Sequence, residues 1–333
     1  METKKILITG AAGFIGFHLS KRLLKDGWNV YGLDNLNAYY DVKLKEDRLE
    51  ILHGYDAFSF HKLDLADKDK VQALFDTVEI PYVVNLAAQA GVRYSLKDPY
   101  AYTRSNIDGF LNMLVAARDA CVKRFVYAAS SSTYGDHPDL PKEEDKIGKP
   151  LSPYAVTKLV NELYGEVFSR VYDFNTIGLR YFNIFGQRQD PDGAYAAVIP
   201  KWFAGLLIEE PIFINGDGET SRDFCFIENC VQANILAATV ETKQALNQVY
   251  NIAFGESTNL NTLFELIRER INNKLPGTLE AKPIYRDFRS GDVRHSLADI
   301  NKAKQLLGYS PEYSVRGGLD KATDWYLNRF MSI

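Results

Sequence analysis

Lys5-Ile-Leu-Ile-Thr-Gly10-Ala-Ala-Gly13-Phe-Ile-Gly16 is the stretch that decides the fold of this chain. Its short apolar start is typical of a buried strand, and residues 14–25 carry helical periodicity that ends before Gly27. The glycines between them permit a tight turn and a close approach of the backbone to a pyrophosphate. A helix that starts there offers free N–H groups to phosphate oxygens. The stretch therefore predicts a dinucleotide-binding strand–turn–helix unit.

Strands and helices continue to alternate through the first half of the chain. Apolar runs predict strands at 29–33, 59–63, 82–86 and 124–128, and helices are expected at 67–78, about 100–120 and 152–172. This alternation is typical of an α/β fold, here a Rossmann doubly wound parallel sheet whose ligands lie at the carboxyl ends of the strands. After about residue 180 the elements become shorter. We expect a dinucleotide-binding domain over 1–180 and a smaller α/β C-terminal substrate lobe over 181–333, with some segments returning to the first domain.

Residues that follow the predicted strands indicate the kind of dinucleotide. Asp34 closes the second strand, where a carboxylate can hold the ribose hydroxyls of adenosine and repel a 2′-phosphate. No arginine occurs within 35–39, so NAD is favoured over NADP. Asp64-Leu65 follows the third strand and is expected to contact adenine. Asn85-Leu-Ala-Ala-Gln89 supplies small residues where the dinucleotide must pass.

Composition excludes several classes of function. The chain has 333 residues, 46% apolar and 25% charged, with a net charge of -4, so it has no nucleic-acid footprint. Its apolar runs are too short for a membrane span, and the N-terminus passes into a strand pattern without a signal-peptide core. Cys121, Cys225 and Cys230 lack metal-binding spacing, and no metal is expected. These features predict a cytoplasmic protein.

Tyr154 and Lys158 form a candidate proton-transfer pair. They lie four apart in Ser152-Pro-Tyr-Ala-Val-Thr-Lys158, where the sequence starts a helix, and therefore share one face. A lysine ammonium near a phenol favours phenolate and is expected to lower the tyrosine pKa from about 10. The tyrosine can then act as a general base. This spacing alone often arises by chance, so the assignment depends on the rest of the chain.

Taken together, these motifs resemble the extended short-chain dehydrogenase/reductase family over essentially the whole chain. The glycine pattern, Asn-Leu-Ala-Ala, the serine run at 130–132 and Tyr-x-x-x-Lys occur in the family's order. The resemblance implies that Tyr154 is the catalytic base and that Lys158 lowers its pKa and binds the nicotinamide ribose. It also implies that a hydroxyl of the serine run, Ser130 or Ser131 with Ser132 beside them, bonds the reacting sugar oxygen.

The implied cofactor-binding residues are Gly10, Gly13, Phe14, Ile15, Gly16, Asp34, Asn35, Asp64, Leu65, Leu86, Ala87, Ala88, Gln89, Asn106, Tyr154, Lys158 and Tyr181.

The second half is similar to nucleotide-sugar 4-epimerases. Asn183, in Arg180-Tyr-Phe-Asn-Ile-Phe-Gly186, matches a position that binds the substrate diphosphate or sugar. Arg222 and Arg289 match two phosphate-binding arginines, which suits a diphosphate because guanidinium groups bind it in bidentate fashion. The implied substrate-binding residues are Ser131, Tyr154, Asn183, Gln189, Ala197, Val198, Lys201, Asn215, Arg222, Arg289, Asp292 and Ser296.

The resemblance divides between two substrates. Residues 33–48 and 89–95 look like UDP-glucuronate 4-epimerases, whereas 187–200 and 288–296 look like UDP-N-acetylglucosamine 4-epimerases. We give the second lobe more weight because it forms most of the sugar pocket in this family, and Ser296 replaces a bulky Tyr that in some relatives blocks an acetamido group. Arg93 is open to two interpretations, a carboxylate ligand or the partner of a nearby acid.

The implied reaction is a reversible inversion at C4 through a 4-keto sugar with NAD as retained cofactor. UDP-N-acetylglucosamine and UDP-N-acetylgalactosamine are the favoured pair, with UDP-glucose and UDP-galactose as further substrates. The alternatives are a UDP-glucuronate 4-epimerase or decarboxylase and an NAD-binding scaffold or sensor without turnover. Intact Tyr154, Lys158 and serine run argue against the scaffold. Helices at 100–120 and 152–172 also predict a homodimer, since the family pairs them.

Overall fold

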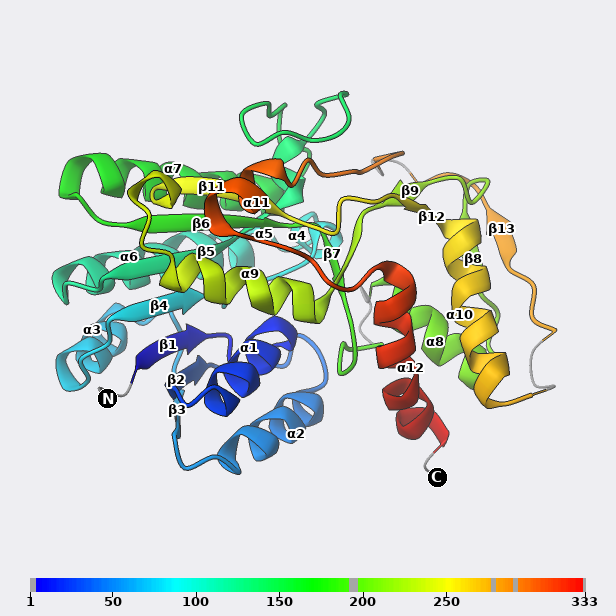
Figure 1. The fold of residues 1–333 in the computed structure, drawn as a ribbon, viewed down its shortest axis with the longest axis horizontal. Coiled ribbons are helices and arrows are strands. Elements are labelled where there is room, and N and C mark those ends of the chain that lie inside the picture. Colours follow the sequence, from blue (N-terminus) through cyan, green and yellow to red (C-terminus); the bar gives the residue numbers. More distant parts are fainter. Residues whose placement is uncertain (1–3, 192–196, 277–279, 290–292, 332–333) are drawn as a thin grey trace.

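The computed structural model describes residues 4–191, 197–276, 280–289 and 293–331, and Figure 1 shows two lobes with the larger one at the left. The larger lobe is built on a seven-stranded sheet in the order β11-β6-β5-β4-β1-β2-β3, in which every described pairing is parallel. Its strands are β1 (Lys5–Thr9), β2 (Asn29–Asp34), β3 (Phe58–Lys62), β4 (Tyr82–Asn85), β5 (Arg124–Ser130), β6 (Thr176–Tyr181) and β11 (Gln248–Ile252). The predicted α/β Rossmann fold class is confirmed.

Helices cover both faces of this sheet because its central strands are apolar on both sides. One face carries α1 (Phe14–Lys25), α2 (Val42–His53), α9 (Ile227–Thr239) and α11 (Asn301–Leu307). The other carries α3 (Lys68–Thr77), α6 (Gly109–Asp119) and α7 (Pro153–Tyr172). β11 and α9 come from the second half of the chain. They complete the sheet edge beside β6 and the layer beside α1.

The smaller lobe lies at the right of Figure 1 and combines helices with short strand pairs. Its helices are α8 (Val198–Leu207), α10 (Leu260–Lys274) and α12 (Val315–Met331). Its strand pairs are β8 (Phe213–Asn215) with β13 (Ile284–Arg286) and β9 (Ser221–Arg222) with β12 (Thr258–Asn259). A third pair, β7 (Asn183–Phe185) with β10 (Phe224–Phe226), lies where the lobes meet.

The helix expected at 100–120 is interrupted. The chain forms α5 (Pro99–Tyr102), a π-helical turn η1 (Thr103–Asp108) and then α6. π-turns insert an extra residue and often occur near functional sites. This one contains Asn106, whose buried amide bonds the backbone of Gln89. The remaining short elements are α4 (Val92–Ser95), the 3-10 turn η2 (Ser131–Tyr134) and the 3-10 turn η3 (Lys243–Ala245).

α2 is a helix that the sequence analysis did not identify. Asp41 caps its first turn by accepting from Lys43 N, and its buried residues recur at helical spacing. Among the described residues, no helix has the length and apolar character needed to cross a bilayer.

Candidate active site

A cavity of about 1470 Å³ lies at the carboxyl ends of β1, β2, β4, β5 and β6, and the smaller lobe forms its other wall. With one exception, the predicted site residues that the structure describes all line it. The exception is Asn106. Asp292 lies outside the described residues. The topology thus brings together residues more than 280 positions apart, from Gly10 to Ser296.

The glycine turn after β1 fits a dinucleotide pyrophosphate. Gly10 has φ +69, and a Cβ there would lie 3.0 Å from Ala87 N, so only glycine is unstrained. A Cβ on Gly16 would lie 2.0 Å from Gly10 O, which requires glycine where α1 packs on the turn. Gly13 caps α1 without a side-chain hydrogen bond, so the N–H groups of its first turn face the cavity for an anion.

Asp34 lies at the end of β2, where the ribose of adenosine was predicted to bind. Its Oδ1 accepts from Leu36 N at 2.8 Å and lies 3.7 Å from Lys45 Nζ. Lys45 is buried, donates to the backbone and side-chain oxygens of Asn37, and has a pKa lowered by burial. A lysine therefore stands beside the carboxylate although no arginine follows within 35–39.

A layer of buried polar groups supports the cofactor side of the cavity. Thr9 Oγ1 donates to Asn85 Oδ1 at 2.8 Å and accepts from Ala87 N at 3.0 Å, which ties the ends of β1 and β4 together. Asn106 accepts from Gln89 N at 2.7 Å and donates to Gln89 O and Thr157 Oγ1. Asn106 was predicted to bind the cofactor, but its side chain holds the Gln89 segment and lies outside the cavity lining.

The catalytic candidates converge at the end of β5 and the start of α7. Ser152 caps α7, with its Oγ accepting from Ala155 N at 3.1 Å, and this fixes the turn that carries Tyr154. The Ser130 hydroxyl accepts from Ser132 N at 3.1 Å and from Ser132 Oγ at 2.9 Å, and its side chain favours the ionised form of the nearby Tyr154 phenol. Of the three serines, Ser130 is the one whose side chain contributes to the pKa of the Tyr154 phenol.

The expected pKa of Tyr154 needs correction. Burial raises the pKa of this phenol, and the hydrogen bond with Ser130 only partly offsets it. Lys158 Nζ lies 6.0 Å from the ring centroid of Tyr154 and donates to Ala128 O at 2.8 Å, so its ammonium is directed at the strand. Burial also lowers the pKa of Lys158 to about 8, against the attraction of Glu162. In this structure, desolvation therefore raises the pKa of Tyr154, whereas its spacing from Lys158 along the helix predicts a lowered pKa.

The wall near the sugar end combines small and hydrogen-bonding residues. Gln189 donates from Nε2 to Ile184 O at 3.1 Å, while its buried Oε1 has no partner among the described residues. Ser296 is held by its N–H, which donates to Ser221 O at 3.1 Å. Asn183 and Ala197 line the same cavity. This wall can accept a hydrogen bond from a ligand and leaves space where a larger side chain would stand.

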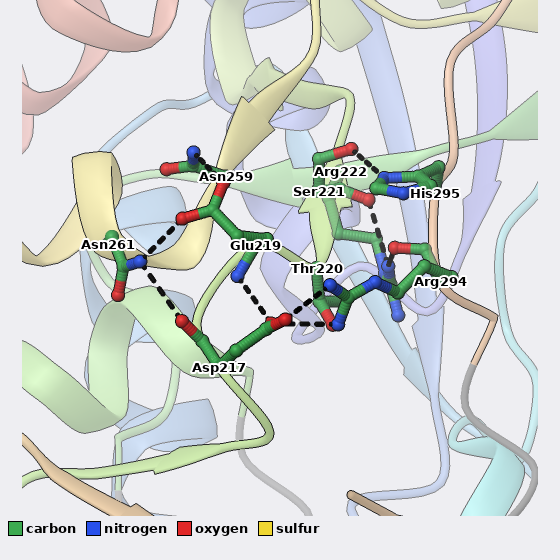
Figure 2. A network of polar contacts seen from close by, with 9 residues as sticks. All are labelled: Asp217, Glu219, Thr220, Ser221, Arg222, Asn259, Asn261, Arg294 and His295. Atoms are coloured by element: carbon green, nitrogen blue, oxygen red, sulfur yellow. Dashed lines mark hydrogen bonds and ion pairs between the residues drawn. The ribbon is translucent and has the colours of Figure 1, made fainter.

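A polar network surrounds Arg222, which lines the cavity (Figure 2). Arg222 Nη1 donates to Ser221 O at 2.8 Å and to Arg294 O at 3.3 Å. Arg294 forms a bidentate pair with Asp217 at 2.8 and 2.6 Å, and this hydrogen bonding lowers the pKa of Asp217 to about 2. Ser221 Oγ bonds His295 Nδ1 at 2.9 Å. The network joins the two cavity-lining segments that carry Arg222 and Ser296.

Two cationic residues of α2, Lys45 and Arg48, line the cavity; they lie in the stretch 33–48 that resembles UDP-glucuronate 4-epimerases but were not among the predicted site residues. The helical spacing of Leu44, Arg48 and Leu52, all buried, is the signal that could have placed them on an inward face. Arg286, on β13, also lines the cavity and stacks on Phe213 with 3.2 Å from Cζ to the ring centroid. No local sequence pattern predicts the position of Arg286, because its strand β13 pairs with β8, about 70 residues earlier in the chain.

The sheet topology, the glycine turn and the cavity between two lobes define a dinucleotide-binding α/β protein with a second ligand-binding lobe. The profile of the NAD dependent epimerase/dehydratase family matches residues 6–253. The chain belongs to this family, and its cofactor is NAD.

Its relatives include 4-epimerases of different UDP-sugars. The UDP-glucuronate 4-epimerase of Thermodesulfobacterium geofontis is 38% identical over 320 residues, covering 96% of this chain and 95% of the relative. The solved UDP-N-acetylglucosamine 4-epimerase of Methanobrevibacter ruminantium, in complex with UDP-N-acetylmuramic acid, is 34% identical with a TM-score of 0.89, covering 99% and 100%. The UDP-glucose 4-epimerase of Thermotoga maritima, with UDP-glucose, is 34% identical with a TM-score of 0.88, covering 98% and 99%.

Proposed function

We propose that this protein interconverts UDP-N-acetylglucosamine and UDP-N-acetylgalactosamine by inversion at C4, with Tyr154 as the catalytic base. At the coarser level it is an NAD-dependent nucleotide-sugar 4-epimerase, as its family and relatives indicate. The observation that carries the finer proposal is the sugar-end wall. There Ser296 leaves space and the buried Gln189 Oε1 offers an acceptor to an amide N–H.

Residues of the larger lobe carry out the proton transfer, and residues of the smaller lobe bind the diphosphate. Tyr154 takes the proton of the 4-hydroxyl and returns it, and the Ser130 hydroxyl holds the phenol in place. NAD, which the glycine turn and Asp34 would hold, would supply a hydride acceptor and donor for C4 and a positively charged nicotinamide ring. The 4-keto sugar must turn about its diphosphate between the two transfers. Arg222 and Arg289 line the cavity, and their guanidinium groups are suited to hold that diphosphate during the turn.

A second substrate, UDP-glucuronate, is favoured by one observation. Arg93 lines the cavity and is exposed, so its guanidinium can reach a sugar carboxylate. The segment 89–95 that carries it is also the part that resembles glucuronate enzymes. Against this, Gln189 and Ser296 offer uncharged hydrogen-bonding groups at the opposite wall. We therefore expect the acetamido sugar to be preferred.

Side-by-side turnover of a UDP-sugar panel tests the proposal. Wild-type protein is incubated with UDP-N-acetylglucosamine, UDP-glucuronate and UDP-glucose, and the products are separated by chromatography with mass detection. We expect the highest kcat/KM for UDP-N-acetylglucosamine. Tyr154→Phe should retain NAD and UDP but lose about 100- to 10,000-fold in kcat, the usual contribution of a positioned acid–base group. Tyr164→Phe, on the same helix but outside the cavity lining, is the matched control. A preference for UDP-glucuronate, or turnover by Tyr154→Phe equal to wild type, contradicts the proposal.

We also propose a homodimer built on the outer face of α7. Exposed apolar residues recur along this helix at helical spacing, and two more lie on the neighbouring segment 96–100. The residues are Val156, Leu163, Val167, Val171, Leu96 and Tyr100, with exposed fractions of 41–85%. Such a stripe marks an interaction surface. Light scattering after size exclusion should give twice the chain mass of 37.7 kDa, and Leu163→Glu with Val167→Glu should return it to the monomer. A monomeric wild type at micromolar concentration would rule the dimer out.

A further inference from the structure

Arg48 is a buried cation that none of the proposed catalytic or ligand-binding roles uses. Its side chain projects from α2 and is fully buried, with 0% exposure, at the cofactor end of the cavity. Burial of a guanidinium is unfavourable unless its donors are satisfied. The partners of Arg48 therefore indicate what this arginine does.

The two terminal nitrogens of Arg48 make three hydrogen bonds to three separate segments, whereas its buried Nε has no partner among the described residues. Nη1 donates to Ala12 O and to the Tyr40 hydroxyl, both at 2.9 Å, and Nη2 donates to Arg188 O. Ala12 lies inside the glycine turn, between Gly10 and Gly13. Arg188 lies in the segment 187–191 that follows β7. All three acceptors are uncharged oxygens, two of the backbone and one the Tyr40 hydroxyl, so none of these contacts is an ion pair.

The segment 187–191 forms part of the sugar-end wall, since Gln189, Asp190 and Pro191 line the cavity. It is fixed to α1 as well as to α2. His18 Nε2 bonds Gln187 O at 2.9 Å, and burial lowers the pKa of His18 to about 3, so the neutral ring donates this bond. The Arg188 guanidinium lies 5.6 Å from the ring centroid of Phe17. This part of the substrate wall is thus attached to the cofactor domain.

We propose that Arg48 is a positioning residue that fixes the substrate wall 187–191 relative to the glycine turn and so aligns the sugar with the dinucleotide. Only arginine meets this geometry, because its planar guanidinium presents five donors in fixed directions, whereas a lysine ammonium is a single point charge. The proposal rests on the proposed epimerase reaction, in which a cofactor and a sugar must meet in one geometry. An error of about 1 Å in such a geometry costs on the order of 100-fold in rate.

Hydrogen exchange and steady-state kinetics of Arg48→Lys test this role in the NAD-bound protein. We expect faster amide exchange in peptides that cover 187–191 and 10–16. We also expect kcat to fall roughly 10- to 100-fold. The Kd for UDP, measured by calorimetry, should change less than threefold, because the hydrogen bonds of Arg48 go to Ala12, Tyr40 and Arg188 and not to Arg222 or Arg289. A merely structural arginine would change exchange throughout the domain.

Arg124→Lys is the matched control, since Arg124 is also buried but contacts Ala237 O outside the cavity lining. If Arg48→Lys does not fold, Tyr40→Phe removes one anchor and should give the same pattern at smaller amplitude. Exchange at wild-type rates in both segments, or an unchanged kcat, overturns the proposal. If wild type turns over no UDP-sugar, the epimerase function is wrong. The exchange rates of 187–191 and 10–16 would still test whether Arg48 fixes these two segments.

Discussion

Lys158→Met should make the NAD-free protein more stable while removing its activity. The wild-type ammonium is buried, and burial lowers its pKa from 10.5 to about 8. This fall in pKa means that the charged Lys158 lowers the free energy of unfolding at pH 7 by about 3 kcal/mol. Methionine also removes the hydrogen bond to Ala128 O, a loss of about 1 kcal/mol. We expect a net gain of about 2 kcal/mol at pH 7.

The gain must depend on pH in one direction. Between the folded pKa of about 8 and the unfolded value of 10.5, the unfolded state binds more protons at Lys158, so wild-type stability rises with pH in this window. The advantage of the Lys158→Met variant should therefore shrink by about 2 kcal/mol between pH 7 and pH 9.5. Comparing wild type and variant at each pH cancels the titration of all other groups that the two proteins share.

Urea denaturation of the two proteins at both pH values measures these free energies of unfolding. Lys201→Met, at an exposed lysine of the same cavity, is the control and should stay within about 0.5 kcal/mol of wild type. Epimerase activity of Lys158→Met should be lost at either pH. The reasoning is refuted if the variant is less stable than wild type at pH 7, or if the difference does not change with pH.

Three further substitutions test separate parts of the site. Ser296→Tyr should reduce kcat/KM for UDP-N-acetylglucosamine at least tenfold more than for UDP-glucose; equal losses in paired assays would contradict the pocket argument. Gly16→Ala places a Cβ 2.0 Å from Gly10 O and should destabilise the protein by about 1–3 kcal/mol with loss of bound NAD. Thermal denaturation and cofactor release measure this, with Gly317→Ala, which meets nothing closer than 3.9 Å, as control. Ser130→Ala should lower kcat roughly 100-fold and Ser131→Ala less than tenfold, because the phenol contact belongs to Ser130.

The first half of the chain was predictable because its signals are local. The strand at 5–9 and the helices at 14–25 and 153–172 are bounded by glycine, Asp or Ser-Pro signals that act within a few residues. The glycine turn could be located because its conformation depends on backbone sterics alone. The π-turn at 103–108 could not, since it depends on the contact between Asn106 and Gln89 across the sheet edge.

The remaining features could not be predicted because they depend on strand pairing over long sequence distances and on burial in the fold. β8 pairs with β13 although about 70 residues separate them, and strands of three residues carry too short a pattern to predict. The raised pKa of Tyr154 could not follow from its distance to Lys158 along a helix. It depends on desolvation by elements that converge only in the fold. Helical spacing identified the pair, but the three-dimensional environment determines its charge state.

The position of β11 has a consequence for how the chain is made. β11 occupies one edge of the main sheet, beside β6, and α9 covers the face that α1 shares. α9 is complete only when the ribosome has passed residue 239 and β11 only when it has passed residue 252, so a nascent dinucleotide-binding half has an unpaired β6 edge and an uncovered apolar face. Exposed edges of this kind pair with other chains and aggregate. A fragment ending near residue 180 should therefore be recovered from expression as insoluble material, and its solubility should return when residues 227–252 are supplied.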